Sequence, residues 1–262
     1  SLLLRANASV VVQTESGSGA LLLAAEYGHA KCLSALLESG ARTSIADDAD
    51  KHGTKQPKTP LAAAAANGYH ECVELLLAKD LDACVPASPD APMSGVLMEA
   101  VRHGHEPCVT LLVEAGADAD ERDEHGKTAL MVAAEAGFEA CMVRLLCTAC
   151  DINAQVTQPS SAGDNDDASL RTDCSERQRR NDALLLNGWT ALMVTAKNGH
   201  SACMHRLLAR DADVTASMPS DGRTALLIAV ENGHVTCVQS LLASCAVAHD
   251  GKTALATLQD GS

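Results

Sequence analysis

A short motif recurs six times along this chain of 262 residues and constrains its fold more than any other feature. The motif is a glycine, then a histidine or an aromatic residue, with a cysteine four residues after the glycine. Successive glycines are 40, 36, 33, 62 and 34 residues apart. These spacings indicate six copies of a unit of about 33 residues, with extra residues inserted between some copies. The pairs that define repeats 1 to 6 are Gly28 and Cys32, Gly68 and Cys72, Gly104 and Cys108, Gly137 and Cys141, Gly199 and Cys203, and Gly233 and Cys237.

Each repeat reads as two short helices that meet at the glycine. A leucine stands seven residues before the glycine in every repeat, and in four repeats a threonine stands nine residues before it. Threonine can cap the start of a helix, and glycine can end one by adopting a left-handed conformation. The sequence therefore predicts a first helix within 128–137 and a second within 138–146, with equivalent pairs elsewhere. The threonines are Thr59, Thr128, Thr190 and Thr224.

This unit resembles the ankyrin repeat, which reads roughly G-x-T-P-L-H-x-A-A-x-x-G-H-x-x-I-V-x-L-L-L-x-x-G-A-D. The resemblance covers nearly the whole chain, and its clearest copies are 125–146, 187–208 and 221–242. It implies an all-α solenoid of stacked helix-turn-helix units with finger loops between them. The sequence departs from the family pattern where leucine, alanine or methionine replaces the histidine of T-P-L-H, and where cysteine replaces the isoleucine of the second helix. These departures are similar to those of expanded ankyrin families in parasitic protists.

Applied along the whole chain, the repeat divides it into five segments. The sequence begins inside one repeat and stops inside another, so we expect a fragment of a longer array. The low hydrophobicity and mixed charge of the insertion between repeats 4 and 5 predict a flexible loop. We expect no regular structure in the linkers 42–58 and 82–95, which are polar or rich in proline. The segments are 1–19 (the tail of a preceding repeat and a linker), 20–153 (repeats 1 to 4), 154–186 (the insertion), 187–249 (repeats 5 and 6) and 250–262 (the start of a truncated repeat).

Charge and composition limit the classes of partner. Acidic residues outnumber basic ones by 34 to 20, which gives a net charge of −14. Nucleic acid and anionic membranes repel such a surface, so we predict no nucleic-acid partner. No apolar run approaches the length of a membrane-spanning helix, so we also predict no membrane insertion. Because the 11 cysteines show no small-domain disulfide framework, we expect a cytoplasmic protein, with association with the cytoskeleton as an option.

We interpret the six repeated cysteines as a row of small buried hydrophobic residues. Equivalent positions in stacked repeats are roughly 10 Å apart, too far for a disulfide or a shared zinc ion. In this interpretation each cysteine faces the next repeat, and Cys141→Ser destabilises the array. Cys147 and Cys150 form a C-x-x-C that alignment with the family pattern also assigns to packing. Cys84, in a linker, and Cys174, in the insertion, are expected to be the more exposed thiols.

The histidine that follows the turn glycine is expected to support packing. Tyr69 and Phe138 take its place in two repeats. Because neither of those rings titrates near neutral pH, the position needs no catalytic or metal-binding role to explain it. The histidines are His29, His105, His200 and His234.

No arrangement of residues in the sequence supports catalysis. The GKT triplets at 126–128 and 251–253 lack the earlier glycine of a phosphate-binding loop. No Ser-His-Asp or paired-carboxylate site can be assembled on this scaffold, so we predict no enzyme activity, no cofactor and no metal site. The predicted function is a protein–protein interaction scaffold that binds a partner protein through its concave face and finger loops. Two alternatives remain, a targeting or regulatory ankyrin module of a larger enzyme such as a protein kinase, and a structural or cytoskeletal spacer.

The residues expected to contact a partner occupy the ends of the first helices and the finger loops, where exposed positions vary. Trp189 stands where other repeats carry Lys127, Arg223 or Lys252. Such a position is expected to face solvent, which would make Trp189 an interface anchor; alternatively, the ring folds onto the adjacent insertion. The first-helix candidates are Glu26, Tyr27, Asn67, Arg102, His103, Glu135, Lys197, Asn198, Glu231 and Asn232. The finger candidates are Arg122, Asp123, Glu124, His125, Trp189, Asp221 and Arg223.

Overall fold

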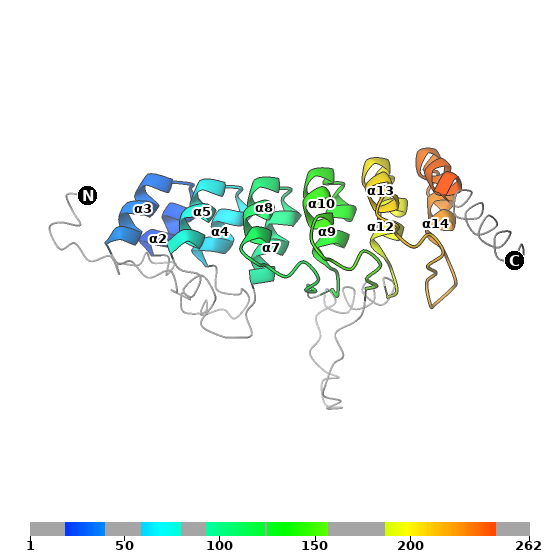
Figure 1. Ribbon diagram of the computed structural model, residues 1–262, viewed down its shortest axis with the longest axis horizontal. Helices are drawn as coiled ribbons and strands as arrows, with labels where there is room; N and C mark the ends of the chain where they lie inside the picture. The colour runs from blue at the N-terminus through cyan, green and yellow to red at the C-terminus, as the bar shows by residue number, and fades with distance from the viewer. Residues whose placement is uncertain (1–18, 40–58, 80–92, 124, 157–186, 245–262) are drawn as a thin grey trace, which may run out of the picture. The chain divides into compact units, whose positions relative to one another are not determined.

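The protein is described by a computed structural model in two compact bodies, Ser1–Ala119 and Asp120–Ser262. Helix pairs make up each body (Figure 1). Repeats 1 to 3 fall in the N-terminal body and repeats 4 to 6 in the C-terminal body. The residues that the structure describes are 19–39, 59–79, 93–123, 125–156 and 187–244.

The N-terminal body stacks three helix pairs in sequence order. The first helices pack against one another as α2–α4–α7, and the second helices as α3–α5–α8. Helix α7 begins at Met93, so the expectation of no regular structure in 82–95 is wrong for 93–95. These three residues form the first turn of the helix whose next turns bury Val96, Leu97 and Ala100. The pairs are α2 (Ala20–Glu26) with α3 (Ala30–Glu38), α4 (Pro60–Ala66) with α5 (His70–Lys79), and α7 (Met93–Arg102) with α8 (Glu106–Glu114).

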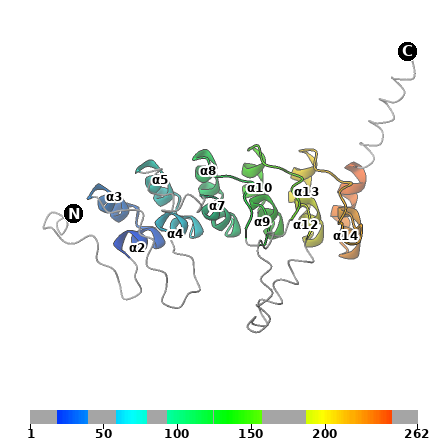
Figure 2. The same ribbon diagram turned by 90° about the horizontal axis from the view of Figure 1, so that it is seen from below.

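The C-terminal body repeats the arrangement, with α9, α12 and α14 in one row (Figure 2). Helices α10 and α13 pack beside each other in the second row. Arg206 forms an ion pair with Glu139 at 2.8 Å, and Arg210 donates to the carbonyl oxygen of Leu146 at 2.6 Å. Repeats 4 and 5 are therefore stacked directly, although the insertion separates them in sequence. The helices are α9 (Ala129–Ala136), α10 (Glu139–Leu146), α12 (Ala191–Asn198), α13 (Ser201–Leu208) and α14 (Ala225–Glu231), followed by helical residues 235–244.

The all-α fold class is confirmed, as are the two helices predicted within 128–137 and 138–146. Each turn glycine has a positive φ between 70° and 77°. All four threonines occupy the N-cap position. Side-chain capping holds in two cases, because Thr59 Oγ1 accepts from Ala62 N at 3.1 Å and Thr190 Oγ1 from Met193 N at 3.4 Å. Thr128 and Thr224 make no such bond, so capping by their hydroxyls is wrong.

The repeated cysteines are buried as predicted in every repeat but the first. Cys32 is exposed, whereas Cys237, in the last described repeat, is 0% exposed. In repeat 5, burial and then the charge of Glu139 from repeat 4 raise the pKa of the Cys203 thiol. The Cys203 thiol of repeat 5 therefore lies near repeat 4. For the other repeats, the expectation that the cysteine faces the next repeat stays a prediction. The buried thiols are Cys72, Cys108, Cys141, Cys203 and Cys237.

The other cysteines divide between partial burial and solvent. Cys150 is half-buried and its thiol donates to the carbonyl oxygen of Leu145 at 3.3 Å, in keeping with a packing role. Cys147 caps the end of α10 but is exposed, so packing is the wrong interpretation for that side chain. Cys84 and Cys174 lie outside the described residues.

Candidate functional site

The rings that follow the turn glycines join one repeat to the one before it. The His200 ring lies against Gly137, and its Nε2 lies 3.1 Å from the carbonyl oxygen of Glu135. The His105 ring lies in the same way on repeat 2 and the His234 ring on repeat 5, with Nε2–oxygen distances of 3.0 Å and 2.9 Å. The expected packing role is confirmed for these three histidines, because each ring contacts the backbone of the preceding repeat.

The asparagines beside the turns are also tied to the backbone. Asn67 Nδ2 donates to the carbonyl oxygen of Ala63 at 2.9 Å, and Asn232 Nδ2 donates to that of Ile228 at 2.8 Å. Asn198 Nδ2 donates to the carbonyl oxygen of Glu135 in the preceding repeat at 3.3 Å. These three side chains are exposed, but each amide is hydrogen-bonded to the backbone at the end of a helix. Their positions on the surface are therefore fixed by the fold.

Two finger candidates of repeat 4 shape their own loop. Asp123 Oδ1 accepts the backbone N–H groups of His125 and Lys127, each at 2.9 Å. Arg122 Nη1 donates to the carbonyl oxygen of Gly126 at 2.9 Å and to that of Gln155 in the next finger at 2.6 Å. Arg122 therefore links two successive fingers. Glu124 lies outside the described residues.

The residues on either side of the insertion, Val156 and Trp189, form the base of an ordinary finger. In all three fingers of the C-terminal body, one backbone N–H donates across the loop at 2.9 Å to the residue before the capping threonine. In the finger of repeat 5, Gly188 N also donates back to the carbonyl oxygen of Val156 at 2.9 Å. The insertion 157–186 thus leaves and returns through one hydrogen-bonded base. The N–H donors and carbonyl acceptors are Asp123 and Lys127, Val156 and Trp189, and Met218 and Arg223.

Finger and first helix meet through side chains eight residues apart. Lys127 forms an ion pair with Glu135 at 2.6 Å, and Arg223 forms one with Glu231 at 3.1 Å. At the equivalent positions of repeat 5, the Lys197 ammonium lies 5.3 Å from the ring centroid of Trp189. In repeats 4 and 6 the finger residue is a cation and the helix residue a carboxylate. In repeat 5 the finger residue is the aromatic Trp189 and the helix residue the cation Lys197.

The prediction of a solvent-facing Trp189 is wrong. The residue is 6% exposed. The Lys197 ammonium lies over its ring, and its backbone carbonyl oxygen accepts from Val156 N. The eight-residue spacing to Lys197 is the sequence signal that would have found this pair. Contact with insertion residues 157–186 lies outside the described part of the chain.

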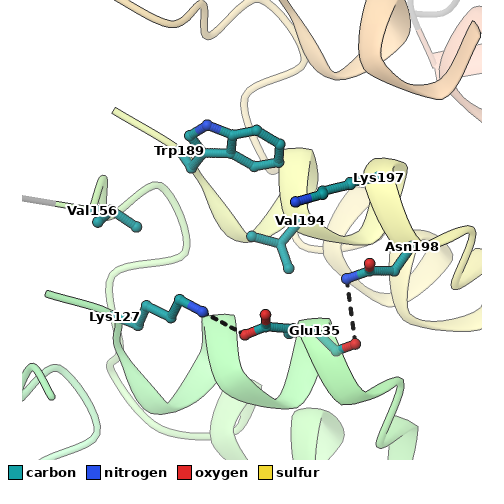
Figure 3. A pocket seen from close by; sticks show the side chains of 7 residues that line it. All are labelled: Lys127, Glu135, Val156, Trp189, Val194, Lys197 and Asn198. Atoms are coloured by element: carbon teal, nitrogen blue, oxygen red, sulfur yellow. Dashed lines mark hydrogen bonds and ion pairs between the residues drawn. The ribbon is translucent and has the colours of Figure 1, made fainter. Parts of the chain in front are cut away.

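A shallow pocket opens at this pair of side chains (Figure 3). Trp189, Val156 and Val194 supply apolar surface, and Figure 3 shows Lys127 and Glu135 joined along one side with Lys197 across from them. All lining residues belong to the C-terminal body. They are Lys127, Glu135, Val156, Trp189, Val194, Lys197 and Asn198.

Arg223 organises the finger of repeat 6 through charge. Its backbone N–H donates to Asp221 Oδ1 at 3.1 Å and lowers the pKa of that carboxyl, and its guanidinium, 2.5 Å from Oδ2, adds to the effect. Hydrogen bonds to Asp221 and then to Glu231 raise the pKa of Arg223. These groups are exposed, so the cluster is open to competition from a partner's charges.

The candidates of the N-terminal body lie on separate repeats. Tyr27 is 62% exposed and its ring stacks beside that of His29 at 6.3 Å. Arg102 and His103 both reach Glu99, at 3.3 Å and 3.8 Å. The carbonyl oxygen of Glu26 accepts from Asn67 at 3.4 Å.

The described ranges contain neither a candidate metal site nor a candidate membrane-spanning helix. Within 19–39, 59–79, 93–123, 125–156 and 187–244, no cluster of three or more His, Cys, Asp or Glu side chains is placed to hold a metal ion. In the same ranges, none of the helices has the length and apolar character needed to cross a bilayer.

Comparison with known families decides the identity of the repeat. A family model described as ankyrin repeats (3 copies) matches residues 1–87, 89–156 and 165–256. The chain belongs to the ankyrin-repeat family. Its fold is similar to the crystal structure of the ankyrin repeat domain of Bcl-3, a member of the IkappaB protein family, with a TM-score of 0.63 and 23% identity. That match covers 88% of this chain and 87% of the other.

Relatives with ankyrin repeats are much longer than this chain. The transient receptor potential cation channel subfamily A member 1 homolog of Caenorhabditis elegans is 36% identical over 126 residues, which is 48% of this chain and 10% of that protein. Synphilin-1 of Mus musculus is 27% identical over 157 residues, 58% of this chain and 15% of that protein. The probable E3 ubiquitin-protein ligase XBOS33 of Oryza sativa subsp. japonica is 32% identical over 177 residues, 60% of this chain and 32% of that protein. Ankyrin repeats in general are modules that bind other proteins.

Proposed function

We propose that this ankyrin array binds a partner protein through its finger-and-first-helix face, the surface that the finger loops and the exposed ends of the first helices form within each of the two bodies. The observation that carries the proposal is the change of side-chain chemistry at fixed positions on a repeated framework. The same two positions hold Lys127 with Glu135, then Trp189 with Lys197, then Arg223 with Glu231.

Different side chains at equivalent exposed positions can recognise different groups on a partner, whereas the stacking of the repeats does not require them to differ. The core beneath the first two of these pairs stays the same, since the first-helix leucines Leu130 and Leu192 are both 2% exposed. Repeat proteins bind through extended surfaces whose exposed positions differ between repeats. Exposed ion pairs add little to stability, typically less than about 1 kcal/mol. The face therefore has charges that a partner can engage without weakening the fold.

Affinity capture with matched variants tests the proposal. The face variant carries Tyr27→Ala, Lys197→Ala and Glu231→Ala. The control variant removes the same charges from exposed positions of the second helices, with Lys31→Ala, Glu74→Ala and Gln239→Ala. We expect a protein retained by the wild type and the control variant to be lost from the face variant, with equal helicity and thermal midpoints for all three. Equal retention by both variants would refute binding through this face.

A second candidate is an interaction module that serves a larger enzyme. It is favoured by the match to the rice protein named as a probable E3 ubiquitin-protein ligase, where this chain aligns with 32% of the relative. Sequencing the transcript on both sides of the region encoding this chain tests it, because a catalytic domain in the same reading frame is required.

We also infer an intracellular location. All cysteines in the described ranges are free thiols, which suits a reducing compartment. A fluorescent fusion expressed in the source cells tests this inference, and a secreted product would contradict it.

A further inference from the structure

We propose that the pocket beside Trp189 binds an extended segment of the partner that places a carboxylate next to an aliphatic side chain. The inference rests on the proposed function and names the chemistry that this part of the face recognises. Two properties of the pocket carry it, an apolar lining and a cation, Lys197, that forms no ion pair with a carboxylate of the described residues.

The lining favours an aliphatic side chain. Val156 is 1% exposed, Trp189 6% and Val194 7%, so each presents only a small part of its surface to the hollow that they share (Figure 3). A hollow of this kind takes a side chain rather than a whole ligand. Its walls come from both stems of one finger and from α12, and the base of the finger is held by hydrogen bonds in both directions. The pocket is therefore preformed, which lowers the entropic cost of binding.

The charge at the rim favours a carboxylate. Lys127 is already paired with Glu135 at 2.6 Å, whereas Lys197 rests over the Trp189 ring, and no carboxylate of the described residues forms an ion pair with it. Both neighbours of Lys197 in the row of first-helix ends, Glu135 and Glu231, are already paired with finger cations. A partner's carboxylate would complete in repeat 5 the pairing that repeats 4 and 6 make internally.

The remainder of the chain limits how acidic that segment can be. The net charge is −14, so a run of carboxylates would be repelled while a single one beside Lys197 gains a close ion pair. A basic side chain would meet Lys127 and Lys197 together. The geometry thus selects one acidic residue adjacent to an aliphatic residue.

Selection from a library of random displayed peptides tests the preference on the full chain. The baits are the wild type, Lys197→Glu and, as matched control, Lys31→Glu on the exposed face of a second helix. We expect the wild type and the control to enrich peptides with Asp or Glu within two positions of Leu, Ile or Val. Enrichment of peptides without a carboxylate, or the same set on Lys197→Glu, overturns the proposal.

Trp189 then reports on the pocket directly, because it is the single tryptophan of the chain. The most enriched peptide is titrated while tryptophan emission is followed. We expect saturable change, with affinity weakened about tenfold or more when its carboxylate is changed to the amide. The reversed pair, Lys197→Glu with a lysine in place of the acidic residue, should recover part of the lost affinity. Lys197→Gln, which removes the positive charge without adding a negative one, serves if Lys197→Glu fails to fold.

The outcomes separate this inference from the proposed function. If the face variant loses a cellular partner but the amide peptide binds as well as the acid, binding through the face stands and the pocket chemistry is overturned. If peptides bind only after 157–186 is replaced by a short turn, the occupant is the chain's own insertion and the proposal is likewise overturned.

Discussion

Substitution of Gly137 by alanine tests the joint between repeats 4 and 5 quantitatively. Gly137 has φ +75°, where an L-residue costs roughly 1–2 kcal/mol. An added Cβ would lie 2.8 Å from Cε1 and Nδ1 of the His200 ring, so the ring must move. That movement breaks the 3.1 Å contact between His200 Nε2 and the carbonyl oxygen of Glu135, worth about 0.5–1.5 kcal/mol. The total expected loss is about 1.5–3.5 kcal/mol of unfolding free energy.

Gly222→Ala supplies the matched control. Gly222 has nearly the same φ, +72°, but an added Cβ meets nothing within 4 Å. It therefore carries the backbone strain of about 1–2 kcal/mol without the ring displacement. The loss of chain entropy in the unfolded state on changing glycine to alanine is common to both variants and cancels in the comparison.

Urea unfolding followed by circular dichroism and by Trp189 emission measures both variants. We expect Gly137→Ala to lower stability more than Gly222→Ala, with the larger effect on the tryptophan signal, because Trp189 lies at the affected joint. Combining Gly137→Ala with His200→Ala should cost less than the sum of the two single changes, since the ring is then absent. Equal losses for the two glycine variants, or strict additivity in the double variant, would refute the ring–glycine joint.

Three further predictions concern the core, the thiols and the insertion. Cys141→Ser should lower the unfolding free energy by about 1–3 kcal/mol because it buries a hydroxyl. Cys32→Ser, at the same position in repeat 1 but exposed, should change it by less than about 0.5 kcal/mol. Equal urea midpoints for the two variants would contradict this. Burial raises the pKa of the repeated thiols in repeats 2, 5 and 6. Their contribution to stability is therefore full below the unfolded thiol pKa of about 8.5 and is lost as the pH rises through the folded-state pKa. Urea unfolding at increasing pH that shows no decline in the unfolding free energy would be inconsistent with this. Replacing 157–186 by a short glycine-containing turn should leave the thermal midpoint within a few degrees, because the hydrogen-bonded base of Val156 and Trp189 closes the finger without the insertion; cooperative loss of repeat 5 in calorimetry would argue the reverse.

The fold could be predicted from the sequence because its signals are local. A threonine before the first helix and a glycine after it fix both ends of α9, from Ala129 to Ala136, without any knowledge of neighbouring repeats. The start of α7 at Met93 is not predicted, because the prolines and the glycine in this part of the sequence favour a turn, whereas the helix buries residues such as Val96 and Leu97.

The positions of the repeated cysteines and of Trp189 depend on contacts with residues that are distant in the sequence. A repeated cysteine predicts burial but does not say which neighbour buries it, and Cys32 is exposed although it occupies the same position in its repeat as the buried Cys237. Trp189 was placed in solvent by analogy with Lys127 and Arg223, although its partner, Lys197, lies eight residues away on the next helix. Comparing both positions together across the repeats would have revealed the exchange of ion pair for cation and ring.

Site-specific photocrosslinking tests most directly whether this chain binds a partner through its finger-and-first-helix face. A benzophenone amino acid is placed at Glu231, exposed at the end of α14, or at Gln239, exposed on the second helix of the same repeat. Both variants are irradiated in lysate of the source cells. The account predicts a discrete crosslinked partner from position 231 and none from position 239. Crosslinks from position 239 alone, or the same products from both, would contradict it.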